Sequence, residues 1–520
     1  MRIVIVHYHF FPGGVTSAVR SSLLAMKSAG RAENIEFVLL CGHERGIGEL
    51  TELLRCTTLD IKGFVHPELF YRQEIWPSRE AFEDEAIRIS ELLLGYGKKE
   101  TIFWVHNPTI GKNPALTRAL IIAAQKAEKE SLPYCFLYHI HDFPECGRPN
   151  NLKYLLNCYP GGGLKILYPE SLNTFFICIN SSDRGLLIQS GVPESKVFFL
   201  PNAISVNYEA ASVTSTVHVD SALEKYAEKH GYVFKKGSPW WLMPIRLIRR
   251  KNALEAFFLE VLDEGMQILI TLDANSQPEY PYANAVKDVI RREKASGMVG
   301  FGAELVGKAF SFDELILASR AIVTTSLMEG FGFAFLEGPI HGKPVIGRNL
   351  PHVTKDFGQL GLPLDDLYDS FYVPVAENSR RQLKEKFQIF ALHYSKLAGV
   401  RPLAVDRYLS KIDEIYENEA VDFGFLDLET QLDLFCRLKD PGFRNSIRVI
   451  NKRELKYPGI PSEFVQNVDR AFGYQKHAKI LDNIFNTIQN PDLQFKIPSD
   501  LSQKLREAFF APERNKPLFW

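Results

Sequence analysis

Short apolar segments alternate with amphipathic ones along the first 200 residues of the chain. The apolar segments carry hydrophobic residues on both faces, which is typical of strands in a parallel sheet that helices cover on both sides. The segments between them have apolar residues at helical spacing. We expect strands at RIVIVHYHF (2–10), IEFVLLCG (35–42), TIFWVHNP (101–108), YCFLYHIHD (134–142), FFICIN (175–180) and KVFFLPN (196–202). We expect helices at residues 16–30, 113–130 and 182–191.

The alternation stops after Asn202 and resumes near residue 240. The intervening residues are partly polar and aperiodic, which indicates a linker with an insertion. A second series follows, with strands expected at WWLMPIRL (240–247), MQILITLD (266–273), AIVTTS (321–326), KPVIG (343–347) and FYVPV (371–375). From about residue 378 the pattern is mainly helical.

Two alternating series joined by a linker predict an α/β fold with two Rossmann-like, doubly wound domains that face a cleft. A helical C-terminal extension is expected to follow the second domain. The predicted parts are an N-terminal domain (1–204), a linker with an insertion (205–238), a C-terminal domain (239–415) and a mainly helical extension (416–520).

Composition narrows the possible partners and compartment. Of the 520 residues, 46% are hydrophobic and 24% charged, and the formal net charge is −1, so nothing favours a broad nucleic-acid-binding face. The seven cysteines include no C-x-x-C pair, which is typical of reduced thiols in a cytoplasmic protein. The apolar N-terminal run is short and interrupted by histidines, so a first strand is expected there rather than a signal peptide. No segment approaches the ~18 apolar residues of a membrane span.

The segment TTSLMEGFGFAFLEGPIHGKPVIG (324–347) places Glu329 and Glu337 on either side of a Gly/Phe run. We expect a strand, a glycine turn and a helix, so that Glu329, Gly330 and Gly332 lie at the carboxyl end of a parallel strand, where such sheets bind ligands. Glycines let a ligand approach the backbone, and the Glu337 carboxylate could accept hydrogen bonds from a ribose diol. The alternatives are a structural turn with one exposed and one capping glutamate, or a nicotinamide site, although the G-x-G-x-x-G spacing is absent.

Two cations flank another predicted strand–helix junction in the same half of the chain. Arg246 and Lys251 stand on either side of Arg249 and Arg250 in RLIRRKN (246–252). At the carboxyl edge of the sheet they could neutralise a diphosphate, Arg as a fork and Lys as a point charge. The alternative is a solvated basic loop.

Polar residues also follow strands of the first half. In YHIHD, strand alternation directs His139 and His141 to the same face, and we expect His139 in the core and His141 with Asp142 at a site. The loop beyond contains Arg148 and Asn150. No third or fourth ligand has suitable spacing, so no metal site is expected.

Two more segments of the first half carry candidate residues. After TIFWV come His106, Asn107 and Lys112, which are either cleft-facing polar groups or loop and cap residues. The turn PGGVTSAV (12–19) opens a predicted helix, and its backbone N–H groups could meet a phosphate, although two glycines after a strand are common.

These residues together resemble the retaining GT-B glycosyltransferases of family 4, over roughly residues 1–420. The resemblance is strongest over INSSDRGLLIQSGVPESKVFFLPNAI, RLIRRKN and SLMEGFGFAFLEGPIHGKPVIG. It implies an N-terminal acceptor domain and a C-terminal domain for the nucleotide-sugar donor. This chain departs from the family pattern in reading Asn202-Ala203 for Asn-Gly and Ile245-Arg246-Leu247 for Gly-Arg-Leu.

The resemblance also implies roles for residues. The residues expected to take part in catalysis are His141, Arg246, Lys251 and Glu329. The donor is expected to contact Gly14, Val15, Arg246, Lys251, Gly330, Phe331, Gly332, Phe333 and Glu337. The acceptor is expected to contact His106, Lys112, Asp142, Arg148 and Asn150.

The predicted activity is transfer of a sugar from a nucleotide-diphosphate sugar to an acceptor hydroxyl with retention of the anomeric configuration, by a metal-independent hexosyltransferase without a cofactor. The expected partners are a UDP-, GDP- or ADP-linked sugar and a hydroxyl acceptor, with homo-oligomer formation left open. A GT-B sugar phosphorylase and a non-catalytic sugar-nucleotide-binding subunit are the alternatives.

Overall fold

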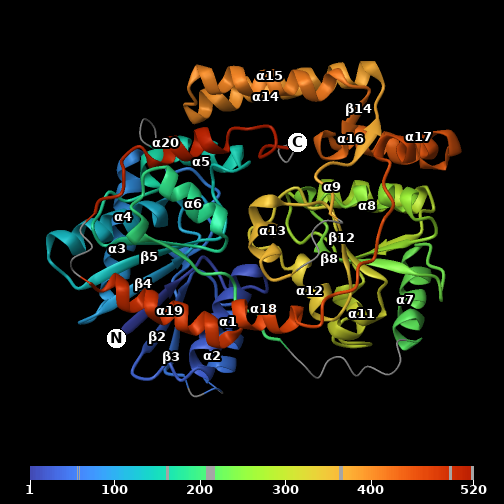
Figure 1. The fold of residues 1–520 in the computed structure, drawn as a ribbon. Helices are drawn as coiled ribbons and strands as arrows, with labels where there is room; N and C mark the ends of the chain where they lie inside the picture. Colours follow the sequence, from blue (N-terminus) through green and yellow to red (C-terminus); the bar gives the residue numbers. More distant parts are fainter. Residues whose placement is uncertain are drawn as a thin grey trace. The chain divides into compact units, whose positions relative to one another are not determined.

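A computed structural model describes residues 1–55, 57, 59–159, 163–206, 217–361, 367–490 and 495–516. The chain forms two compact units, each assembled from separate stretches of sequence (Figure 1). Unit 1 comprises residues 1–205, 393–405 and 468–511, and unit 2 comprises residues 206–392, 406–467 and 512–520. The predicted linker lies partly outside the described residues, at 207–216.

Unit 1 is built on a parallel sheet with the strand order β3-β2-β1-β4-β5-β6-β7 within the described residues. Its strands are β1 (Arg2–Val6), β2 (Glu36–Cys41), β3 (Ile61–Val65), β4 (Thr101–His106), β5 (Tyr134–Ile140), β6 (Thr174–Cys178) and β7 (Val197–Phe199). Its helices include α1 (Gly14–Ser28), α2 (Ile47–Arg55), α3 (Arg79–Gly95), α4 (Pro114–Lys129), α5 (Pro149–Cys158), α6 (Ser181–Gln189), α19 (Tyr474–Ile488) and α20 (Leu501–Phe509).

Unit 2 contains a second parallel sheet, in the order β10-β9-β8-β11-β12. Its strands are β8 (Trp240–Arg246), β9 (Gln267–Leu272), β10 (Gly297–Val299), β11 (Ala321–Thr324) and β12 (Val345–Gly347), beside the two-stranded sheet of β13 (Tyr372–Pro374) and β14 (Ala420–Asp422). Its helices include α7 (Val217–His230), α8 (Leu254–Leu259), α9 (Tyr280–Arg292), α10 (Gly302–Leu305), α11 (Phe312–Ala318), α12 (Ala334–Ile340), α13 (Pro351–Gly358), α16 (Leu428–Cys436) and α17 (Pro441–Asn451). The stretches assigned to both units are α14 (Glu377–Ala398), α15 (Pro402–Glu417) and α18 (Phe464–Phe472).

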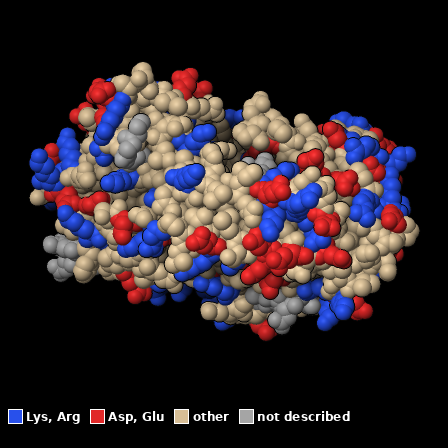
Figure 2. All heavy atoms as spheres, turned by 90° about the horizontal axis from the view of Figure 1, so that it is seen from above, with Lys and Arg blue, Asp and Glu red and all other residues tan. Residues whose placement is uncertain are grey.

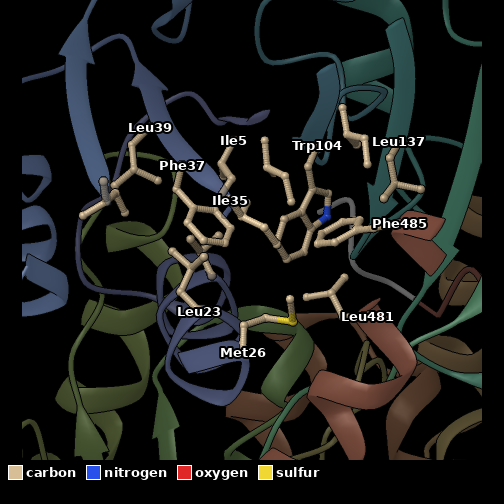
Figure 3. Close-up of a cluster of buried hydrophobic side chains, with 14 of the residues drawn as sticks. Ile5, Leu23, Met26, Ile35, Phe37, Leu39, Trp104, Leu137, Leu481 and Phe485 are labelled. Carbon is tan, nitrogen blue, oxygen red and sulfur yellow. The ribbon is translucent and has the colours of Figure 1, made fainter. Parts of the chain in front are cut away.

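The hydrophobic core of unit 1 contains residues from both early and late parts of the sequence. Alternate residues of the central strands, such as Trp104, pack against Met26 of α1 and Phe485 of α19 (Figure 3). His477 fixes α19 in place, because its Nδ1 donates to the carbonyl oxygen of Pro201 at 2.9 Å and its Nε2 lies 2.9 Å from Ser22 Oγ. A fully buried large apolar side chain contributes about 1.5–3 kcal/mol, so α19 is an integral part of unit 1.

A buried ionic network holds the carboxyl end of β12 in unit 2. Arg348 is 1% exposed and binds Glu255 and Asp422, which are 0% and 5% exposed. Tyr368 donates a hydrogen bond to Glu255 at 2.6 Å, and Lys516 lies 3.0 Å from Asp422. The nearby Arg348 and Lys516 charges hold the pKa of Asp422 below its usual value although burial opposes this. The network thus joins α8, β12, β14 and a residue near the C-terminus.

The predicted fold class is confirmed, since both series of strands form parallel sheets with helices between them. Three of the described strands were not predicted: β3, β10 and β14. The segment FYVPV was assigned to the second parallel series, and this was wrong: it forms β13, which pairs antiparallel with β14. The described helices include none long and apolar enough to cross a membrane. On the face seen in Figure 2, basic and acidic side chains are interspersed, as expected for a net charge of −1.

Candidate functional site

The Glu329/Glu337 segment lies at the carboxyl end of β11, inside the parallel sheet of unit 2. The strand AIVT ends at Thr324, and α12 begins at Ala334. Glu329 stands in the loop between them, and Glu337 in the first turn of α12. The predicted donor residues Gly330, Phe331, Gly332 and Phe333 continue this loop from Glu329 to the start of α12. Because β11 lies beside β8, the basic segment that follows β8 reaches the same edge of the sheet.

Glu329 is a buried carboxylate held by cations. Its side chain is 10% exposed, Lys251 Nζ binds its Oε1, and Arg250 Nη1 lies 3.5 Å from its Oε2. Burial alone would raise the pKa of Glu329, but the charges of Lys251 and Arg250 lower it to about 2. Burial lowers the pKa of Lys251, and the Glu329 charge opposes that shift. The two side chains therefore form an ion pair at neutral pH.

Glu337 has the opposite electrostatic character. Burial raises its pKa to about 7, the Glu329 charge adds to this shift, and Lys251 opposes it. Two carboxyl groups at the same sheet edge thus differ, one ionised and one that takes up a proton near pH 7. A separation of this kind is typical of functional sites, although structural ion-pair networks also produce it.

Arg246 and Arg250 complete the basic edge of unit 2. Arg246 ends β8 and binds the side chains of Asn275 and Glu279, the latter at 3.3 Å. Its side chain is 37% exposed, compared with 13% for Lys251. Arg250 was noted in the sequence but not assigned a role, and it also donates to the carbonyl oxygen of Met328 at 3.0 Å. Only the pairing of β8 with β11, which are distant in sequence, brings Arg250 to Glu329.

In unit 1, His141 and Asp142 follow β5 directly. Asn107, with a left-handed φ of 53°, follows β4 and accepts hydrogen bonds at its Oδ1 from the backbone N–H groups of His141 (2.8 Å) and Asp142 (3.1 Å). His106 Nδ1 lies 2.9 Å from His141 Nε2. His106 is 1% exposed and is a buried neighbour of His141.

His106, His139 and His141 form a buried cluster whose ligand atoms lie within 4.8 Å of one another. The sequence revealed only the His139/His141 pair, and strand pairing adds His106. Burial lowers the pKa of all three imidazoles, so they are neutral at pH 7. Trp104 Nε1 donates to His139 Nδ1 at 3.2 Å, so neutral His139 carries its proton on Nε2. The structure thus brings a third imidazole to the pair, where the sequence analysis expected no further ligand.

The other predicted residues of unit 1 lie at strand ends and helix starts. Gly14 and Val15 begin α1, a helix of 15 residues. Arg148 Nη2 pairs with Asp142 Oδ1 at 3.0 Å. The remaining acceptor candidates are both exposed: Asn150 in the first turn of α5 and Lys112 in the loop after β4.

Comparison with known proteins identifies one curated relative over most of the chain. No protein-family model matches. Mannosylglucosyl-3-phosphoglycerate synthase of Petrotoga mobilis is 29% identical over 453 residues, which are 86% of this chain and 83% of the relative. This name agrees with the predicted class of enzyme, a sugar transferase.

The chain course is also similar in part to that of two solved proteins. Sucrose-phosphate synthase from Thermosynechococcus elongatus has a TM-score of 0.48 and 12% identity, covering 93% of this chain and 98% of that one. Anabaena HepE, solved in complex with UDP and glucose, has a TM-score of 0.42 and 17% identity, covering 66% of this chain and 80% of that one.

Proposed function

We propose that this protein is a retaining glycosyltransferase of family 4 that transfers a hexosyl group from a nucleotide-diphosphate sugar to an anionic sugar acceptor. The main observation behind this proposal is that Lys251, Glu329 and Glu337 lie close together at the edge of the unit 2 sheet. The acceptor class follows from the relative's name, and glucosyl-3-phosphoglycerate is the first candidate.

Each residue of this edge has a role in the proposal. Lys251 and Arg246 bind the donor diphosphate in place of water. They stabilise the charge that develops on the leaving group. Lys251 then shares its charge between the phosphate and Glu329, whose carboxylate accepts hydrogen bonds from the transferred sugar. Glu337, once ionised, accepts two hydrogen bonds from the ribose diol. Because protein cations neutralise the phosphates, the reaction needs no metal ion and no cofactor.

Residues of unit 1 serve the acceptor. The backbone N–H groups of His141 and Asp142 donate hydrogen bonds to the side chain of Asn107, which follows the neighbouring strand β4 and holds these two residues in position. The start of α1 at Gly14 offers unpaired backbone N–H groups, which favour an anion. The free thiols among the described cysteines suit the reducing cytoplasm as the place of action.

A thermal-shift screen of UDP-, GDP- and ADP-linked sugars tests the donor assignment. A ligand at about 100 times its Kd stabilises the folded state by about 2.7 kcal/mol, so one nucleotide class should raise Tm selectively. Lys251→Ala should abolish the shift, whereas Lys126→Met, on an exposed position of α4, should keep it. No shift with any donor would contradict the proposal.

Turnover assays separate the alternatives. A phosphorylase would consume inorganic phosphate with a disaccharide, and a binding subunit would show the thermal shift without product. We expect product only with nucleotide sugar and acceptor together.

A further inference from the structure

Partly exposed aromatic rings gather at the carboxyl end of the unit 1 sheet, among residues to which no role was assigned. His9 and Phe11 follow β1, His43 follows β2, and Phe70 and Tyr71 follow β3. These five residues are termed the aromatic ledge. His9 stacks on Phe11 with centroids 4.2 Å apart, His43 lies 5.2 Å from Phe70, and Phe70 stacks on Tyr71 at 5.4 Å.

The loops that carry the ledge are locked together by close backbone contact. A Cβ at Gly42 would lie 2.0 Å from the backbone nitrogen of Phe70, and one at Gly46 would lie 2.1 Å from the carbonyl oxygen of Phe10. Asn113 Nδ2 donates to the carbonyl oxygens of Glu68 and Phe70, each at 2.8 Å. The ledge is therefore a built surface that three strand ends and the β4–α4 loop hold in place.

Hydrogen bonds orient the exposed edge of the ledge. The backbone N–H of Phe11 donates to His9 Nδ1 at 3.2 Å, so the proton of neutral His9 lies on Nε2, 3.1 Å from the Tyr71 hydroxyl. Burial, together with the nearby His43, lowers the pKa of His9 to about 4. Tyr71 itself is 38% exposed.

Two cations each lie over one ring of the ledge. The guanidinium carbon of Arg45 lies 5.5 Å from the Phe11 ring centroid, and Lys112 Nζ lies 5.7 Å from the Tyr71 ring centroid. Both side chains are exposed. An aromatic face beside a cation matches a pyranose that carries an anionic group, because the C–H face of the sugar packs on the ring and the cation pairs with phosphate or carboxylate.

We infer that the aromatic ledge is the subsite for the sugar ring of an anionic acceptor, with Lys112 on its charged group. This inference rests on the proposed function and extends it to the acceptor. It gives a defined role to Lys112, whose ammonium group lies over the Tyr71 ring. The ledge also lies at the strand ends where parallel sheets bind ligands.

Direct binding tests this assignment with glucosyl-3-phosphoglycerate as the anionic probe and methyl glucoside as its neutral counterpart. We expect Tyr71→Ala to raise the probe Kd about 5- to 10-fold, and Tyr71→Phe to change it less. Lys112→Met should raise it about 10-fold or more and remove the preference for the anionic probe.

Matched controls are available on both units. Tyr372, 42% exposed on β13, and Lys126 on α4 are replaced by Ala and Met, and should leave the probe Kd unchanged. Unchanged probe affinity in Tyr71→Ala and Lys112→Met would overturn the subsite. So would a wild-type protein that binds the nucleotide sugar but not the anionic probe. If the nucleotide sugar does not bind to the wild-type protein, that result contradicts the proposed function itself and not only the acceptor subsite.

Discussion

Nucleotide-sugar binding is expected to weaken as the pH falls below 7, because Glu337 must lose its proton before it accepts two hydrogen bonds from a ribose diol. Burial raises the pKa of this carboxyl from 4.5 to about 7, which corresponds to about 3 kcal/mol against the charged form. If only the ionised form binds, Kd rises about tenfold per pH unit below the pKa, or about 100-fold from pH 8 to pH 5.

Calorimetric titration with an intact nucleotide sugar measures this slope, since its phosphates do not titrate in the range. Glu337→Gln should bind more weakly than wild type at about pH 8 and show little pH dependence. Lys126→Met serves as the control that keeps the wild-type slope. A wild-type Kd that is flat between pH 5 and about pH 8 would refute the role of Glu337.

The same shift has a consequence for unliganded stability. A carboxyl whose pKa is raised on folding stabilises the folded state below its unfolded pKa, and this contribution is lost as the pH rises through about 7. Glu337→Gln should therefore be more stable than wild type above pH 7 without ligand, by up to about 3 kcal/mol, as measured by urea unfolding. If the variant and wild type had equal free energies of unfolding at about pH 8, burial would not be raising the pKa of Glu337.

Substitutions at two further positions test contacts that stabilise the fold. Arg348→Met should destabilise the protein by about 3–5 kcal/mol in urea unfolding, because buried Glu255 loses its cation and buried Asp422 keeps only Lys516. A free energy of unfolding equal to that of wild type would contradict this role of Arg348. Asn107→Gly keeps the left-handed backbone but removes the acceptor for two backbone N–H groups, so it should lose about 1–3 kcal/mol. Asn107→Asp keeps an oxygen there and should lose less, and an equal loss in both would contradict the hydrogen-bond explanation.

Strands buried on both faces were predictable from sequence, since their hydrophobic runs are unbroken. β3 was not, because its sequence IKGFV is interrupted by Lys62 and Gly63 and most of it is exposed at the sheet edge. β10 reads Gly-Met-Val, so only two apolar side chains follow a glycine and no apolar run marks the strand. β13 was predicted as a strand, but its antiparallel partner lies almost 50 residues downstream, and local pattern carries no information on such pairing.

The candidate site, like the fold, could be predicted only in part from the sequence. Glu329 and Glu337 were found because one strand–turn–helix segment carries both. The partnership of Glu329 with Arg250 was not found, because it depends on β8 lying beside β11. The aromatic ledge collects residues from three separate loops, and no periodicity links Phe11 to Tyr71. Functional residues that lie within one segment can be identified from the sequence. Contacts between residues at the ends of different strands can be identified only once the fold is known.

The most direct test of the central claim is the product of a single reaction. The protein is incubated with the nucleotide sugar that raises its Tm and with glucosyl-3-phosphoglycerate, and the products are analysed by mass spectrometry and NMR. We predict the acceptor extended by one hexosyl unit, free nucleoside diphosphate in equal amount, and the anomeric configuration of the donor retained. Absence of product with every donor that binds, or an inverted linkage, would contradict the account.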